Sequence, residues 1–273
     1  MAKHFKSNNK KIAYFTFIIL IIISVSYIIY LAILKLEARK ESNLLNSVEI
    51  ENIHNEITVD ITNEASDETA ETQVTERMLK VRELQKENAN IIGWIEIEGT
   101  RINYSVLQGE DNEYYLDHNY KGEKTANGSI FLNKDYDWNL PSTNMLIYGH
   151  NMKNGEMFTD LIKYQSEDYY KAHPIIRFTT ANEDSTYEIF SVFKSRVYYK
   201  SETNVFRYYN FINANDEAEY NEFVEKAKSS SIYDTGITAS YGDDLITLIT
   251  CSYHVDDGRF VVIGRKFSVG DGP

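Results

Sequence analysis

The chain has 273 residues, with 28 Lys and Arg against 41 Asp and Glu, and a formal net charge of −13 at pH 7. Nucleic acids are bound through clustered basic side chains, so this charge excludes nucleic acid as a partner. The single cysteine cannot form an internal disulfide. In an exported domain, such a thiol is either buried and inert or present for its chemistry.

An uncharged apolar segment occupies residues 12–34. At about 1.5 Å per residue it would cross a hydrocarbon core of about 30 Å, which predicts a transmembrane helix. A cleaved signal peptide is the alternative, but its apolar core is only about 7 to 15 residues long and ends in small residues. Residues 1–11 carry lysines and no acidic residue, which predicts a cytoplasmic arm, a single-pass membrane location and an extracellular C-terminal part.

Residues 35–75 are predicted to form an acidic extracellular stalk. Residues 36–75 contain ten acidic and two basic residues, and no hydrophobic period is sustained there. Such a segment buries too little apolar surface to offset its ordering entropy. The remainder, 76–273, is long enough for one catalytic domain with its own core.

The expected elements of this domain begin with a helix starting near Thr75, because Met78, Val81 and Leu84 follow a three-residue spacing. Many short strands separated by polar turns then predict a mainly β sandwich or barrel. The expected strands are 91–97, 102–107, 128–132, 144–148, 175–179, 186–197, 245–250 and 259–267.

Two helical pieces are expected to interrupt the strands, at 157–164 and 216–229. The second lies in a long excursion, roughly 200–243, between two core strands. A connection of that length in a compact domain is usually functional or carries its own structure.

The apolar run 245–251 ends at Cys251, and a polar cluster separates it from a second strand that opens at Arg259. A symmetric hairpin centred on Val255 would place Cys251 directly opposite Arg259. Opposite residues point to the same face of a sheet. The pattern therefore predicts a thiol and a guanidinium side by side.

Each of these two residues has a simpler interpretation. A free cysteine at a strand end is usually a small buried hydrophobe. Arg259 could be a strand-end cation paired with Asp256 or Asp257, and Arg265 could share its face. The cross-strand register favours Arg259 over Arg265.

A nucleophilic thiol needs an acid or base partner. His150 follows the expected strand 144–148 and a glycine, so its side chain could lean over the sheet end. His254 lies at the tip of the hairpin loop, and His118 and His173 have the pattern of surface residues. Placement along the chain therefore favours His150.

No metal or cofactor is expected. Asp135, Asp137 and Asn139 imitate the opening of a calcium loop, but Leu140 occupies the required Gly position and Leu146 that of the closing Glu. This segment is interpreted as a polar loop.

Three motifs resemble the sortases, membrane-anchored cysteine transpeptidases of Gram-positive bacteria. Thr-Leu-Ile-Thr-Cys at 247–251 is similar to their TLxTC motif, and Tyr-Gly-His-Asn-Met at 148–152 resembles their catalytic-histidine segment. Arg259 resembles their catalytic arginine at the start of the last strand. The resemblance covers roughly 76–268, with all three motifs in the family's order. The leading helix, the continuation after His150 and the helix-bearing excursion resemble class B rather than class A.

The resemblance implies a closed sortase-type β-barrel with an N-terminal helix and a helix-bearing insertion before the cysteine strand. Cys251 would attack the threonine carbonyl of a C-terminal sorting signal and form a thioester. His150 would protonate the leaving amine and then deprotonate the incoming one. Arg259 would hold the oxyanion. Thr250 and the backbone N–H of Ser252 would add oxyanion or substrate contacts.

The implied partners are secreted proteins with a sorting signal, the amine of a peptidoglycan or lipid-linked precursor, and the membrane through residues 12–34. Two alternatives remain. An exported thiol hydrolase or peptidase would use the same residues and end with water. A non-catalytic anchored binding module would merely pack Cys251.

Overall fold

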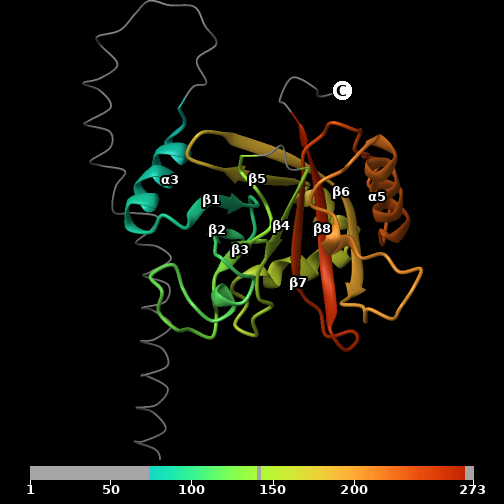
Figure 1. The fold of residues 1–273 in the computed structure, drawn as a ribbon, viewed down its shortest axis with the longest axis horizontal. Coiled ribbons are helices and arrows are strands. Elements are labelled where there is room, and N and C mark those ends of the chain that lie inside the picture. The colour runs from blue at the N-terminus through green and yellow to red at the C-terminus, as the bar shows by residue number, and fades with distance from the viewer. Residues whose placement is uncertain (1–73, 140–142, 268–273) are drawn as a thin grey trace, which may run out of the picture. The chain divides into compact units, whose positions relative to one another are not determined.

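The structure, a computed structural model, describes residues 74–139 and 143–267, which all belong to one compact unit, Thr72–Pro273. Eight strands close into a barrel in the order β1-β2-β3-β4-β7-β8-β6-β5 (Figure 1). The pairs β2–β3 and β4–β7 are parallel and the others antiparallel. Closure leaves no free sheet edge, and the predicted fold class, a mainly β closed barrel, is confirmed. The strands are β1 (Ile91–Glu96), β2 (Asn103–Gln108), β3 (Ile130–Leu132), β4 (Asn144–Tyr148), β5 (Ile175–Thr179), β6 (Asp184–Arg196), β7 (Leu245–Cys251) and β8 (Gly258–Phe267).

The expected N-terminal helix is α3 (Glu76–Glu87), which packs against β1. The hydroxyl of Thr75 accepts the backbone N–H of Met78 at 3.3 Å and so satisfies one of the unpaired donors of the first turn. The buried face of α3 consists of the apolar residues that predicted it.

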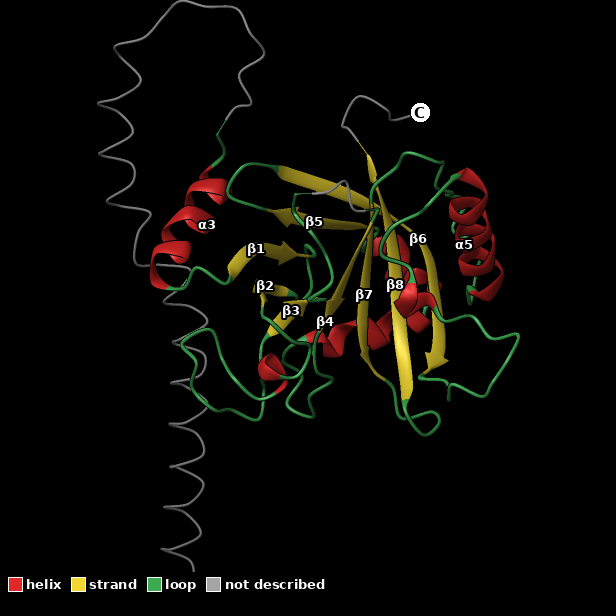
Figure 2. Cartoon of the chain, in the orientation of Figure 1, coloured by secondary structure: helices red, strands yellow, loops and turns green. Residues whose placement is uncertain are grey.

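The expected helical pieces are the 3-10 helix η2 (Phe158–Gln165) and α5 (Glu217–Ser230). Figure 2 shows α5 alongside the sheet, where it contacts β6. Three short helices were not predicted. They are η1 (Tyr114–Leu116), α4 (Glu167–Ala172) and η3 (Tyr208–Asn210).

Strand β7 is buried on both of its faces. Ile246 and Leu248 belong to a cluster with members from all eight strands, which is the barrel interior. Leu245 and Ile249 point the other way, into a second cluster formed with the excursion and α5. Burial on both faces explains why this strand is almost continuously apolar. Since Cys251 lies two residues beyond Ile249, its side chain faces the excursion.

The predicted cytoplasmic arm (1–11), the predicted transmembrane helix (12–34) and all but the last two residues of the predicted stalk (35–75) lie outside the described residues, which begin at 74. Over 74–139 and 143–267, no helix combines the length and the apolar character needed to cross a membrane. The predicted single-pass membrane location and the membrane contact through 12–34 are corrected accordingly, since the structure does not support them.

Candidate active site

The register predicted for the last hairpin is confirmed. Strands β7 and β8 pair antiparallel, with Cys251 directly opposite Arg259. Cys251 is a free cysteine and the one half-buried residue of a strand that is otherwise buried. Its side chain is therefore placed beside that of Arg259 on the excursion face, with partial access to solvent.

His150 comes to Cys251 from the neighbouring strand. β4 runs parallel to β7, with Tyr148 opposite Ile249, and the N–H of Gly149 donates to the Ile249 carbonyl at 3.1 Å. Two residues beyond this pair, the same register brings His150, in the loop after β4, level with Cys251. The candidate acid–base residue, nucleophile and oxyanion holder are thus placed in one row that runs from the end of β4 across β7 to β8.

Glycine is required at 149 because the barrel packs closely against it. A Cβ there would lie 2.4 Å from the Ile130 side chain and 2.7 Å from that of Phe158, closer than non-bonded carbon atoms approach. The backbone that precedes His150 can therefore lie directly against β3 and η2.

The imidazole of His150 has a fixed partner. Its Nε2–H donates to the backbone carbonyl of Leu116, at the end of η1, at 2.6 Å. A carbonyl oxygen only accepts, so Nε2 carries a proton and Nδ1 is left to exchange one with a thiol. Gly128 lies under this carbonyl with a φ of 57°, and a Cβ there would be 2.5 Å from the Leu116 oxygen.

Arg259 bends back over its own turn. Its Nη1 donates to the carbonyls of Asp257 at 3.1 Å and Gly258 at 3.0 Å. Burial raises the pKa of the Tyr148 phenol, and the nearby positive charge of Arg259 opposes part of that shift. The guanidinium therefore lies over the turn that follows Cys251 and near the Tyr148 phenol.

Arg265, the alternative arginine, lies at the other end of the strand pair, opposite Leu245. Its Nη2 forms an ion pair with Glu188 at 3.1 Å. The structure thus separates the two arginines as the register predicted.

Thr250 ties β7 to the segment after β4, and Ser252 holds the hairpin between β7 and β8. The hydroxyl of Thr250 donates to the Gly149 carbonyl at 2.7 Å, and the N–H of Ser252 donates to the Gly258 carbonyl at 2.9 Å. Their support of substrate or oxyanion stays a prediction.

The remaining described histidines have other partners. His254 Nδ1 lies 2.9 Å from the Ser252 hydroxyl, and His118 stacks on Tyr114 with 4.0 Å between ring centroids. His173 Nδ1–H donates to the Glu98 carbonyl at 2.8 Å. None of these three interactions involves Cys251.

Leu116 and Asn151 were missed in the sequence. Leu116 contributes a backbone carbonyl, which every residue type has, so no side-chain pattern indicates it. Asn151 donates from its side-chain nitrogen to the Cys251 carbonyl at 3.0 Å. Its only sequence signal is its place directly after His150.

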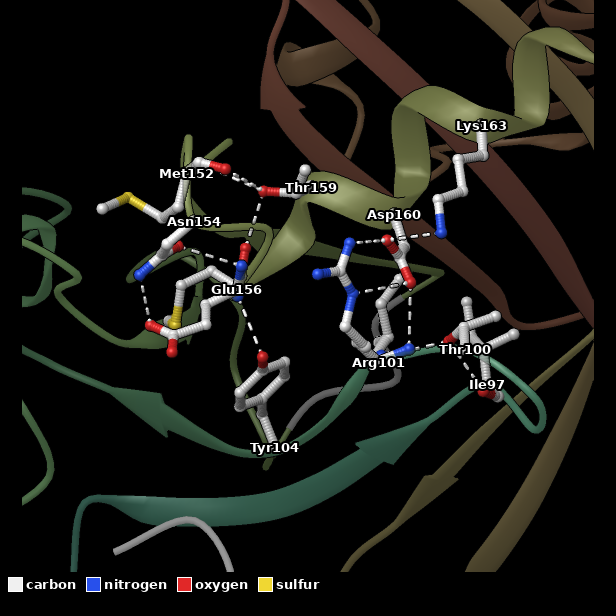
Figure 3. Close-up of polar contacts among 12 residues, drawn as sticks. Ile97, Thr100, Arg101, Tyr104, Met152, Asn154, Glu156, Thr159, Asp160 and Lys163 are labelled. Carbon is white, nitrogen blue, oxygen red and sulfur yellow. Dashed lines mark hydrogen bonds and ion pairs between the residues drawn. The ribbon is translucent and has the colours of Figure 1, made fainter. Parts of the chain in front are cut away.

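Ion pairs of a buried carboxylate with two half-exposed cations anchor η2, which follows the His150 loop (Figure 3). The Asp160 carboxylate, only 2% exposed, accepts the backbone N–H of Arg101 at 3.0 Å and its Nη2 at 2.7 Å. Lys163 adds a contact at 3.0 Å. Burial is the largest effect on the pKa of Asp160 and raises it, but the hydrogen bonds and charges of Arg101 and Lys163 together outweigh burial and lower that pKa.

Asp160→Asn is expected to reduce the free energy of unfolding by about 2 kcal/mol at pH 7, because Arg101 and Lys163 lose their charged partner. A folded-state pKa below the unfolded value of about 3.9 gives stability that is fully present above pH 4 and lost as the pH falls through the folded pKa. The difference in free energy of unfolding between the wild type and Asp160→Asn, measured by urea unfolding, should therefore be smaller at pH 3 than at pH 7. The exposed Asp168→Asn change serves as the control and should cost under about 0.5 kcal/mol. An equal difference in free energy of unfolding at both pH values would contradict this account.

The segment considered as a calcium loop is described only in part, since residues 140–142 lie outside the described ranges. Over the parts of the chain that the structure describes, no group of three or more His, Cys, Asp or Glu side chains could hold a metal ion. The backbone N–H of Asn139 donates to the Asp137 carboxylate at 2.8 Å, a contact within the loop.

Comparisons with known proteins agree with this geometry. The Sortase domain family matches residues 95–267. A sortase B of Listeria monocytogenes is 36% identical over 222 residues, which cover 79% of this chain and 86% of the relative. The Staphylococcus aureus sortase B–substrate complex has a TM-score of 0.63 at 28% identity, over 70% of this chain and 86% of that one. A sortase B complexed with triglycine has a TM-score of 0.63 at 29% identity, over 72% and 89%.

The barrel, the cysteine hairpin and the family match together define the class: the chain belongs to the sortase family. Its similarity to curated and solved sortase B proteins assigns it to class B. The chain is therefore a sortase-type transpeptidase.

Proposed function

We propose that this sortase cleaves the C-terminal sorting signal of secreted proteins after threonine and transfers the protein to a cell-wall peptide amine. The proposal rests chiefly on the row of His150, Cys251 and Arg259 across three neighbouring strands. Residues 76–273 form the catalytic domain in this proposal. The reaction belongs to the thiol peptidase class in its first half and to acyl transfer in its second.

In the first half, the Cys251 thiolate attacks the threonine carbonyl, and the electron pair of the C=O bond moves onto oxygen. Arg259 stabilises this oxyanion, a role worth about 10²- to 10³-fold in rate. The tetrahedral intermediate then collapses and breaks the peptide C–N bond. The protonated His150 donates its proton to the departing amine, which leaves an acyl-enzyme thioester.

In the second half, an amine attacks the thioester while neutral His150 removes a proton from its nitrogen. The C–S bond breaks, a new amide forms, and the thiolate and protonated imidazole are restored. General acid–base help of this kind contributes about 10²- to 10⁴-fold. No oxidant, reductant or metal is required for the atoms and charges to balance.

Two of the similar structures support the choice of substrates. The Staphylococcus aureus sortase B was solved as a substrate complex, and another sortase B was solved with triglycine. For this chain we infer the same two classes of partner: a sorting-signal peptide and a glycine-type or other peptidoglycan amine, free or on a lipid-linked precursor.

The partition of product between amine and water tests the proposal. The described domain is incubated with a labelled sorting-signal peptide, with and without triglycine, and products are separated by mass. We expect most of the product to become the triglycine adduct as the amine concentration rises. If the ratio of amine adduct to hydrolysis product did not change with triglycine concentration, the protein would instead be a thiol hydrolase.

A further inference from the structure

The contact between the His150 loop and the Cys251 backbone has a consequence beyond the three site residues. Regular pairing of β4 with β7 ends at Tyr148 and Ile249. Beyond that point two side chains continue the connection. Thr250 donates to the Gly149 carbonyl at 2.7 Å, and Asn151 donates to the Cys251 carbonyl at 3.0 Å.

Asn151 is itself held on a closed loop. It forms an isolated β-bridge with Met157, and the Thr159 hydroxyl accepts the Met152 N–H at 2.7 Å and donates to the Met152 carbonyl at 2.9 Å (Figure 3). The N–H of Met157 donates to the Tyr104 hydroxyl at 2.9 Å. The loop therefore presents the Asn151 amide in one place.

The backbone of this loop also carries strain. Met157 has a φ of 57° and a ψ of −132°, a positive-φ conformation outside the left-handed helical region that costs an L-residue about 1 to 3 kcal/mol. Burial of its side chain and the Tyr104 contact hold it there. A strained residue is retained where the surrounding structure fixes a particular geometry, and here that geometry aims Asn151 at β7.

The amide of Asn151 holds the peptide group that follows Cys251. Its hydrogen bond to the Cys251 carbonyl and the bond from the Ser252 N–H to the Gly258 carbonyl act on the two sides of that peptide plane. Together they restrict the ψ angle of Cys251 and so help to hold the direction of its side chain. Because the Asn151 bond comes from the loop that carries His150, it ties the imidazole and the sulfur to the same part of the backbone.

We propose that Asn151 is a positioning residue, which holds the Cys251 backbone against the His150 loop so that proton exchange between His150 and Cys251 keeps its geometry. The assignment rests on the proposed function, because it is stated for the thioester reaction. It adds a residue that touches neither substrate nor the reacting atoms.

Asn151→Ala and the isosteric Asn151→Asp both remove the donor. Because misplacement by about 1 Å costs about 10²-fold in rate, we expect kcat with the sorting-signal peptide to fall about 10- to 100-fold, while KM stays within about 2-fold. The matched control is Asn154→Ala, which removes an amide of the same loop that donates to Glu156 at 2.7 Å and should keep wild-type kcat. Wild-type kcat in both Asn151 variants would overturn the proposal, and so would an equal fall in the control.

A second readout needs no peptide substrate. The rate of Cys251 alkylation by iodoacetamide at pH 7, normalised to the folded fraction from circular dichroism, should fall several-fold in both Asn151 variants and stay unchanged in Asn154→Ala. If the wild type processed no sorting-signal peptide, the proposed function would fail while alkylation still decided the role of Asn151. Alkylation at the wild-type rate in both variants would overturn that role.

Discussion

Cys251→Ala is expected to abolish both cleavage of the sorting-signal peptide and transfer to an amine. Without a sulfur no thioester can form, and loss of a catalytic nucleophile typically costs about 10⁴- to 10⁶-fold in kcat. The measurement is turnover of the labelled peptide, together with mass spectrometry of the acyl-enzyme after acid quenching. The wild type should carry the peptide fragment on Cys251, and the variant should carry none.

The fold should survive this change. Cys251 is the half-buried last residue of β7, and alanine removes a single sulfur atom at the edge of the core. We expect the melting temperature to shift by only a few degrees. Ser229→Ala on α5 serves as the control, since that exposed hydroxyl donates to the Lys226 carbonyl of its own helix. Unimpaired cleavage by Cys251→Ala would favour the non-catalytic binding module, in which Cys251 is packed without chemistry.

Much of this hairpin was predictable because its determinants are local. The polar turn between two apolar runs predicted a symmetric hairpin, and Cys251 is paired with Arg259 as expected. The apolar spacing of α3 and of α5 likewise reports which face is buried. Such patterns depend on strand and helix periods alone.

The placement of His150 level with Cys251 depends instead on tertiary topology. The two residues are far apart in sequence, and the parallel pairing of β4 with β7 brings the ends of their strands side by side, whereas no local pattern states which strands are neighbours. The Leu116 carbonyl is a backbone group and carries no residue-type signal at all. Composition and spacing therefore led to the side chains of the site, and the topology supplied their contacts.

Arg259→Lys is expected to lower kcat/KM about 10²-fold while retaining the positive charge. Over residues 74–139 and 143–267, the hydrogen bonds of Arg259 come from Nη1 alone, which leaves Nη2 and Nε to face a substrate oxyanion. Lysine offers a point charge in place of this planar fork of donors. The lysine ammonium could not bond the turn carbonyls and the oxyanion at the same time, so a donor to the oxyanion would be lost. Loss of one such donor costs about 10²- to 10³-fold in rate.

The matched control is Arg265→Lys on the same strand. At about 3.3 Å per residue, its position lies roughly 20 Å from Arg259, and its ion pair with Glu188 can be kept by lysine. Steady-state kinetics should therefore show wild-type kcat/KM for Arg265→Lys and a fall confined largely to kcat for Arg259→Lys. If the loss appeared in KM alone, Arg259 would bind the peptide equally in ground and transition states, and the oxyanion role would pass to backbone donors. Equal losses in the two variants would contradict a special role for the guanidinium fork beside Cys251, because the Arg265 change lies at the other end of the strand pair.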